Sequence, residues 1–108
     1  MLTFLTAMAL AEPVLTPPQG EALRCGVVFA LGARLQQQNH AVARNWPPLA
    51  TRGKDYFVRV TAKLMDDTRA SRETLSAMAM RQVPALSPPA ATAAAMPGCL
   101  ALLDASGR

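Results

Sequence analysis

Apolar and polar positions recur with helical spacing along most of this chain. The clearest pattern runs from Pro48 to about Asp67, where apolar residues return every three or four positions and charged residues occupy the opposite face. Such a pattern predicts an amphipathic helix with one buried face. The predicted inner face consists of Leu49, Gly53, Tyr56, Phe57, Val60 and Leu64.

Two more helices follow from the same spacing. The segment from about Pro17 to Gln38 has so broad an apolar arc that it predicts a central helix, contacted on more than one side. Asn39 is expected to end it in a left-handed conformation. A third helix is expected to open after Ser71 as its N-cap and to stop at Pro84.

The C-terminal part is expected to divide at Pro97, which should end or kink an alanine-rich helix and open a last short one. Pro-Pro pairs at 17–18, 47–48 and 88–89 each precede a helical pattern, with Thr16 and Ser87 as suitable N-caps. These segments predict an all-α, single-domain bundle of about four helices.

Composition agrees with this fold class. The chain has 108 residues, of which 51% are hydrophobic and only 5% aromatic, so it can bury one modest core. Alanine, leucine and methionine are plentiful, which favours helix over sheet.

The first residues indicate export. An apolar run from Leu2 to Met8 precedes Ala9-Leu10-Ala11, a pattern that signal peptidase reads, although no basic residue precedes the run. We therefore expect a signal peptide over 1–11 and a helical domain over 12–108. The alternative is an apolar N-terminal strap packed on the core. No transmembrane segment is expected in the mature chain, because the longest other apolar run, Cys25 to Ala33, is far shorter than a bilayer span.

Two cysteines, Cys25 and Cys99, lie near opposite ends of the chain, each on a predicted apolar helix face. We predict that they form a disulfide between the first and last helices, which must then be neighbours. An exported domain with a small core gains much from such a link. The alternative is a pair of buried free thiols. Two cysteines and one histidine do not make a structural zinc site, so no metal is expected.

No motif indicates catalysis. His40 is the only histidine and lies in a polar link, no nucleophile elbow is present, and the six glycines are scattered rather than gathered in a phosphate-binding loop. We expect no enzyme activity and no cofactor.

The formal net charge is +4, and Arg52, Arg59 and Lys63 are expected to form a basic face on the second helix. Such a face could contact an anionic surface. The second and third helices also have the layout of a helix-turn-helix, so the alternative function is a cytoplasmic nucleic-acid-binding module with free cysteines. Asp66 and Asp67 would repel phosphate, and no specific nucleic-acid binding is expected.

Met65, Met78 and Met80 are a candidate lining for an apolar groove that takes a peptide or a lipid. The alternative is that these side chains fill gaps in a small core. We expect a periplasmic or secreted protein, otherwise a cytoplasmic one, with a structural, chaperone-like or partner-binding role. In layout it resembles small periplasmic helical proteins, including acid-stress chaperones, and this general likeness assigns a role to no residue.

Overall fold

The computed structural model describes residues 12–106, which contain helices and no strand. The elements, in chain order, are α1 (Pro17–Gln37), the 3-10 helix η1 (Ala41–Ala43), α2 (Ala50–Thr68), α3 (Arg72–Met80), α4 (Val83–Leu86) and α5 (Pro89–Ala105). The predicted all-α fold is confirmed. The predicted leader over 1–11 lies outside the described residues.

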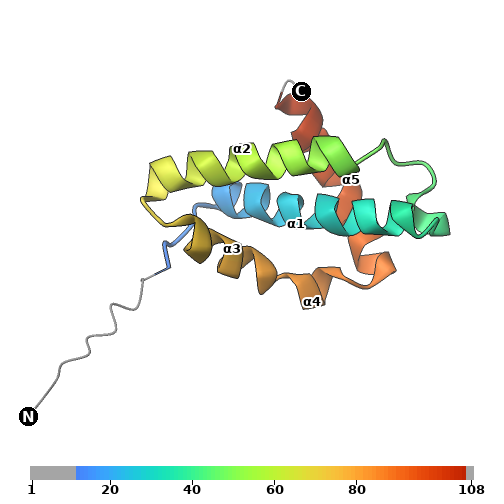
Figure 1. Cartoon of the computed structure of the whole chain (residues 1–108), viewed down its shortest axis with the longest axis horizontal. Helices are drawn as coiled ribbons and strands as arrows, with labels where there is room; N and C mark the ends of the chain where they lie inside the picture. The colour runs from blue at the N-terminus through green and yellow to red at the C-terminus, as the bar shows by residue number, and fades with distance from the viewer. Residues whose placement is uncertain (1–11, 107–108) are drawn as a thin grey trace, which may run out of the picture.

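Helix α1 is the centre of the bundle (Figure 1). Helix α2 runs antiparallel along one side of α1, α3 and α4 follow each other along another side, and α5 crosses α1 and α2. Helix α1 contacts all four of the other α-helices. Its broad apolar arc therefore has the several partners that the sequence predicted.

Three predicted helix ends are confirmed. Thr16 and Gln19 form a capping box at the start of α1, because each side chain pairs with the other residue's backbone N–H. Asn39 follows α1 with a φ of 54°, in the left-handed region. Ser71 Oγ accepts a hydrogen bond of 3.1 Å from the backbone N–H of Thr74 at the start of α3.

The predicted break at Pro97 is wrong, since α5 continues through that residue. A proline inside a helix removes one backbone hydrogen bond and costs about 3 kcal/mol. Pro97 is exposed, whereas Met96 and Cys99 on either side of it are buried. Packing therefore holds both halves of α5 in place while the disturbed turn faces solvent.

The third helix also ends earlier than predicted. Helix α3 stops at Met80, and Pro84 lies in the first turn of the short α4. A proline is tolerated there, because a backbone N–H in the first turn has no partner within the helix. Ser87 follows α4 as its C-cap and Pro88 precedes α5, so the predicted N-cap role of Ser87 is wrong.

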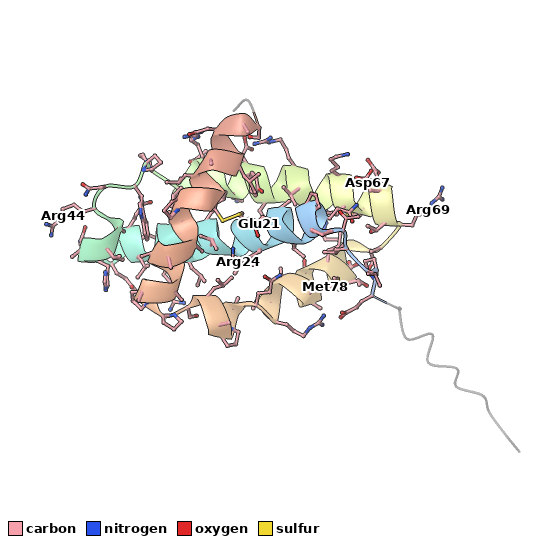
Figure 2. All side chains as sticks on the ribbon, turned by 180° about the vertical axis from the view of Figure 1, so that it is seen from behind. Glu21, Arg24, Arg44, Asp67, Arg69 and Met78 are labelled. Atoms are coloured by element: carbon pink, nitrogen blue, oxygen red, sulfur yellow. A yellow bond between two sulfur atoms is a disulfide. The ribbon has the colours of Figure 1, made fainter. Side chains whose placement is uncertain are left out.

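Cys25 and Cys99 are bonded as a disulfide, with Cα atoms 5.2 Å apart and a sequence separation of 74. Figure 2 shows this bond in yellow where α5 crosses α1. Both residues are fully buried. The predicted link between the first and last helices is confirmed.

The hydrophobic core lies between α1 and the helices around it. Its largest fully buried side chains are Phe29, Leu23, Leu49, Leu75, Met96 and Leu103. Within residues 12–106, no helix has the length and hydropathy needed to cross a membrane.

Candidate functional site: an apolar groove between α1, α2 and α3

A groove with a volume of about 380 Å³ lies between α1, α2 and the α3–α4 segment. We call it the apolar groove. Its lining is almost entirely apolar. The lining residues are Gly26, Val27, Phe29, Ala30, Leu31, Ala33, Leu49, Ala50, Gly53, Lys54, Phe57, Ser76, Ala79, Met80 and Val83.

Two glycines set the distance between α1 and α2 at the floor of this groove. A Cβ atom on Gly26 would lie 3.0 Å from Cε1 of Phe57 and closer still to Cδ1. A Cβ atom on Gly53 would lie 2.8 Å from Cβ of Phe29. Each helix therefore places a phenylalanine over a glycine of the other, which lets both rings line the groove.

Tyr56 supports Phe29 from behind the groove. The two rings pack edge to face with centroids 5.0 Å apart, and the Tyr56 hydroxyl donates a 3.1 Å hydrogen bond to the carbonyl oxygen of Ala22. Burial raises the pKa of the Tyr56 phenol, and the negative charge of Glu21 raises it further, although Arg59 opposes the shift.

A second hollow of about 210 Å³ adjoins the apolar groove, because Phe57 and Ser76 line both. We call it the Thr61 hollow. Its lining is Phe57, Val58, Thr61, Ala62, Met65, Arg72 and Ser76. Thr61 is one of these lining residues, and its hydroxyl is buried with no hydrogen-bond partner among the described residues.

The charged residues that line the two hollows are both cations. Lys54 lines the apolar groove and Arg72 lines the Thr61 hollow, and no acidic side chain lines either. Within residues 12–106, neither Lys54 nor Arg72 forms an ion pair. The combined site is therefore apolar in its walls and positive in its charge.

The structure separates the three methionines of the predicted groove. Met80 lines the apolar groove and is 66% exposed at its edge. Met65 lines the Thr61 hollow, and Met78 is partly buried against the core without lining either hollow. The apolar surface at this site comes mostly from α1 and α2 rather than from methionine.

The predicted basic face is partly neutralised. Arg52 lies 3.6 Å from the Asp104 carboxylate, and Lys63 lies 3.1 Å from the Asp67 carboxylate. Arg59 is half-buried, and its Nε and Nη2 atoms are buried without a hydrogen-bond partner in the described part of the chain. The three side chains therefore do not present three free charges to one partner.

The remaining candidate chemical groups have structural contacts. His40 Nδ1 accepts a 3.1 Å hydrogen bond from the backbone N–H of Val42 and so caps η1. Glu21 Oε1 lies 3.6 Å from Cys25 Sγ, and Glu21, Cys25 and Cys99 bring potential ligand atoms within 4.8 Å of one another. Because the two sulfurs are bonded to each other, this cluster offers no thiolate to a metal.

No protein-family model matches the chain, and comparisons with curated proteins and with solved structures give no significant match. The site itself is therefore what bears on function.

Proposed function

We propose that this protein is a non-enzymatic binding protein whose apolar groove holds the alkyl chain of a single-chain amphiphile. The observation that carries the proposal is the continuous apolar lining that α1, α2 and α3–α4 provide together. Burial of alkyl groups in such a lining is favourable by about 0.8 kcal/mol per CH₂.

The size of the groove favours a small molecule over a partner helix. Its volume of about 380 Å³ falls within the roughly 300–1,000 Å³ of typical small-molecule sites. A stable protein interface needs about 800 Å² from each partner, which a groove of this size does not supply. The exposed Met80 at its edge can adapt to guests of different shape.

Charge further restricts the guest. Lys54 and Arg72 are the charged residues of the two hollows, so a cationic guest would be repelled and an anionic or neutral one accepted. The alternative function, nucleic-acid binding, has weaker support. Arg52 and Lys63 of the predicted basic face already have acidic partners.

We also propose that the protein acts outside the cytoplasm. The buried Cys25–Cys99 disulfide supports this, because disulfides persist in oxidising compartments. Intact mass of protein taken from the native host, measured with and without reductant and alkylation, tests it. Loss of 1–11 with blocked thiols is expected, whereas an uncleaved chain with two alkylatable thiols would contradict export.

The groove proposal is tested with N-phenyl-1-naphthylamine, a neutral dye that fluoresces in apolar surroundings. We expect saturable binding to the wild-type protein and competition by dodecanoate. Ala30→Phe should abolish both, because Ala30 lines the groove yet is exposed, so that the larger side chain can fill the groove without entering the core.

Ala101→Phe is the matched control, because Ala101 is an exposed α5 residue outside the two hollows. It should bind the dye like the wild-type protein. Equal dye binding by the wild type and by Ala30→Phe would overturn the proposed site.

A further inference from the structure

We infer that Met80 is an oxidation site that regulates the apolar groove: a peroxide converts its thioether to a sulfoxide, and the guest then binds more weakly. This inference rests on the proposed function and adds the regulation of the same site. It predicts which methionine reacts first and what that reaction does to binding, neither of which follows from groove binding alone.

Met80 is the most exposed of the four methionines within residues 12–106. It is 66% exposed, whereas Met96 is fully buried. Met65 and Met78 are partly buried against the core. A peroxide must reach the sulfur atom from solvent, so the rate of oxidation follows exposure. Met80 should therefore react first among these four.

Met80 is also the methionine of the apolar groove. It lines that groove as the last residue of α3. Met65 lines the Thr61 hollow instead, and Met78 lines neither hollow. The most exposed thioether is thus the one that lies where the guest binds, so a reaction at its sulfur changes the guest's surroundings.

The reaction needs only a peroxide as co-reactant. Hydrogen peroxide transfers one oxygen atom to Sδ of Met80, so that the O–O bond breaks and an S–O bond forms. The proton of the transferred hydroxyl moves to the leaving hydroxide, which departs as water. The sulfur loses two electrons and the peroxide gains them. Methionine sulfoxide reductases return the thioether with two electrons from thiols.

A sulfoxide makes the edge of the groove polar. Its oxygen accepts hydrogen bonds from water, and a guest that covers the side chain would remove some of them. Burial of an alkyl chain against this edge is then less favourable. We expect about a fivefold loss of affinity, because a side chain as exposed as Met80 keeps part of its contact with water.

The test treats the full chain with hydrogen peroxide and follows two readouts. Mass spectrometry of proteolytic peptides gives the oxidation rate of each methionine, and titration with N-phenyl-1-naphthylamine gives the affinity of the groove. We expect Met80 to be oxidised before Met65, Met78 and Met96, and the dye affinity to fall in step with Met80. Methionine sulfoxide reductases should restore that affinity.

Met80→Leu keeps an apolar side chain of similar size and removes the sulfur. This variant should bind the dye like the wild type before treatment and should lose no affinity in peroxide. Met78→Leu is the matched control, because Met78 lies two residues away on α3 and lines neither hollow. It should lose affinity in peroxide as the wild type does.

Three results would overturn the inference while the dye still binds the untreated wild type. Faster oxidation of Met65, Met78 or Met96 would show that exposure does not select Met80. Complete oxidation of Met80 without loss of dye affinity would remove the regulation. An equal loss in Met80→Leu and the wild type would assign the effect to another group. Absence of dye binding before treatment would instead overturn the proposed function, and the inference with it.

Discussion

The ring of Phe57 on α2 lies against the backbone of Gly26 on α1, in space that a Cβ atom would occupy. Phe57 also lines both the apolar groove and the Thr61 hollow. The helix contact that stabilises the bundle and the wall of the candidate site therefore depend on the same side chain.

Gly26→Ala should destabilise the protein by about 1–3 kcal/mol, the usual cost of overpacking. The added methyl group would lie 3.0 Å or less from two ring atoms of Phe57, so the ring or the helices must move. Chemical denaturation measures the loss. Weaker binding of N-phenyl-1-naphthylamine is expected with it, since the wall of the groove changes.

Gly20→Ala is the control. Gly20 also lies in α1, and a Cβ atom there would have no neighbour within 4 Å. Alanine should stabilise the helix by about 0.5–1 kcal/mol through its higher helix propensity. If both substitutions changed stability equally, the Gly26–Phe57 contact would not limit the helix spacing.

The Cys25–Cys99 disulfide should contribute about 4 kcal/mol to the free energy of unfolding. Its residues are 74 apart in sequence, and closing so long a loop removes much conformational entropy from the unfolded chain. Urea denaturation with and without reductant measures the difference. The variant Cys25→Ala/Cys99→Ala should match the reduced wild type and should not respond to reductant.

Unchanged urea midpoints in reductant, with alkylation proving that both thiols are free, would contradict this expectation. They would mean that the covalent link does not restrict the unfolded chain beyond the residual structure that this chain already retains.

The elements that the sequence predicted well are those with a strong local signal. The N-caps Thr16 and Ser71, the left-handed Asn39 and the apolar face of α2 each depend on residues within a few positions of one another. The pairing of Cys25 with Cys99 needed one further assumption, that helices at the two ends are neighbours.

Pro97 shows why the rest could not be predicted. Local rules make a proline a helix breaker, but whether the helix continues through Pro97 depends on which side of α5 faces solvent. That side is fixed by packing against α1 and by the disulfide at Cys99, which are distant in sequence. Tertiary contacts outweighed the local preference.

Most of the lining of the candidate site was missed for a similar reason, although Met80 and Met65 were predicted. A second stripe on α2 recurs at helical spacing and consists of Gly53, Phe57 and Thr61, with Lys54 and Val58 beside them. Apart from Lys54 and Thr61, these residues are small or apolar. That stripe was a usable signal for a second apolar face. It does not show that α1 and α3 leave a groove over the stripe, or that Thr61 lacks a hydrogen-bond partner.

Stability should fall at alkaline pH because of Tyr56. Burial and Glu21 raise the pKa of its phenol above the ordinary value of 10.0. The unfolded chain therefore loses this proton first, and above pH 10.0 the unfolded state is favoured progressively until the folded phenol also ionises. Urea denaturation over a series of pH values measures the loss.

Tyr56→Phe is the control, because it removes the titrating group and should lose less stability above pH 10.0 than the wild type. Tyr56 is the only tyrosine, so phenolate absorbance of the folded protein reports its pKa directly. An absorbance midpoint at or below 10.0 would contradict the prediction.

Gln36 should stabilise the connection between α1 and α2. Its amide nitrogen donates to the carbonyl oxygens of Trp46 and Pro47 at 3.3 and 2.8 Å, and its amide oxygen accepts from the backbone N–H of Leu49 at 3.0 Å. Gln36→Glu keeps the size and the acceptor but replaces both donors with a charge that faces two carbonyls. A loss of about 2 kcal/mol in the free energy of unfolding is expected.

Gln37→Glu separates this effect from the helix dipole. Both residues lie in the last turn of α1, where a negative charge is unfavourable by about 0.3–1 kcal/mol, but Gln37 is exposed. The larger loss in Gln36→Glu should coincide with faster hydrogen exchange at the Leu49 amide, because repulsion from the two carbonyls displaces the carboxylate that would accept from this amide. If both variants lost equal stability, the two hydrogen bonds that Gln36 donates would contribute nothing beyond the dipole.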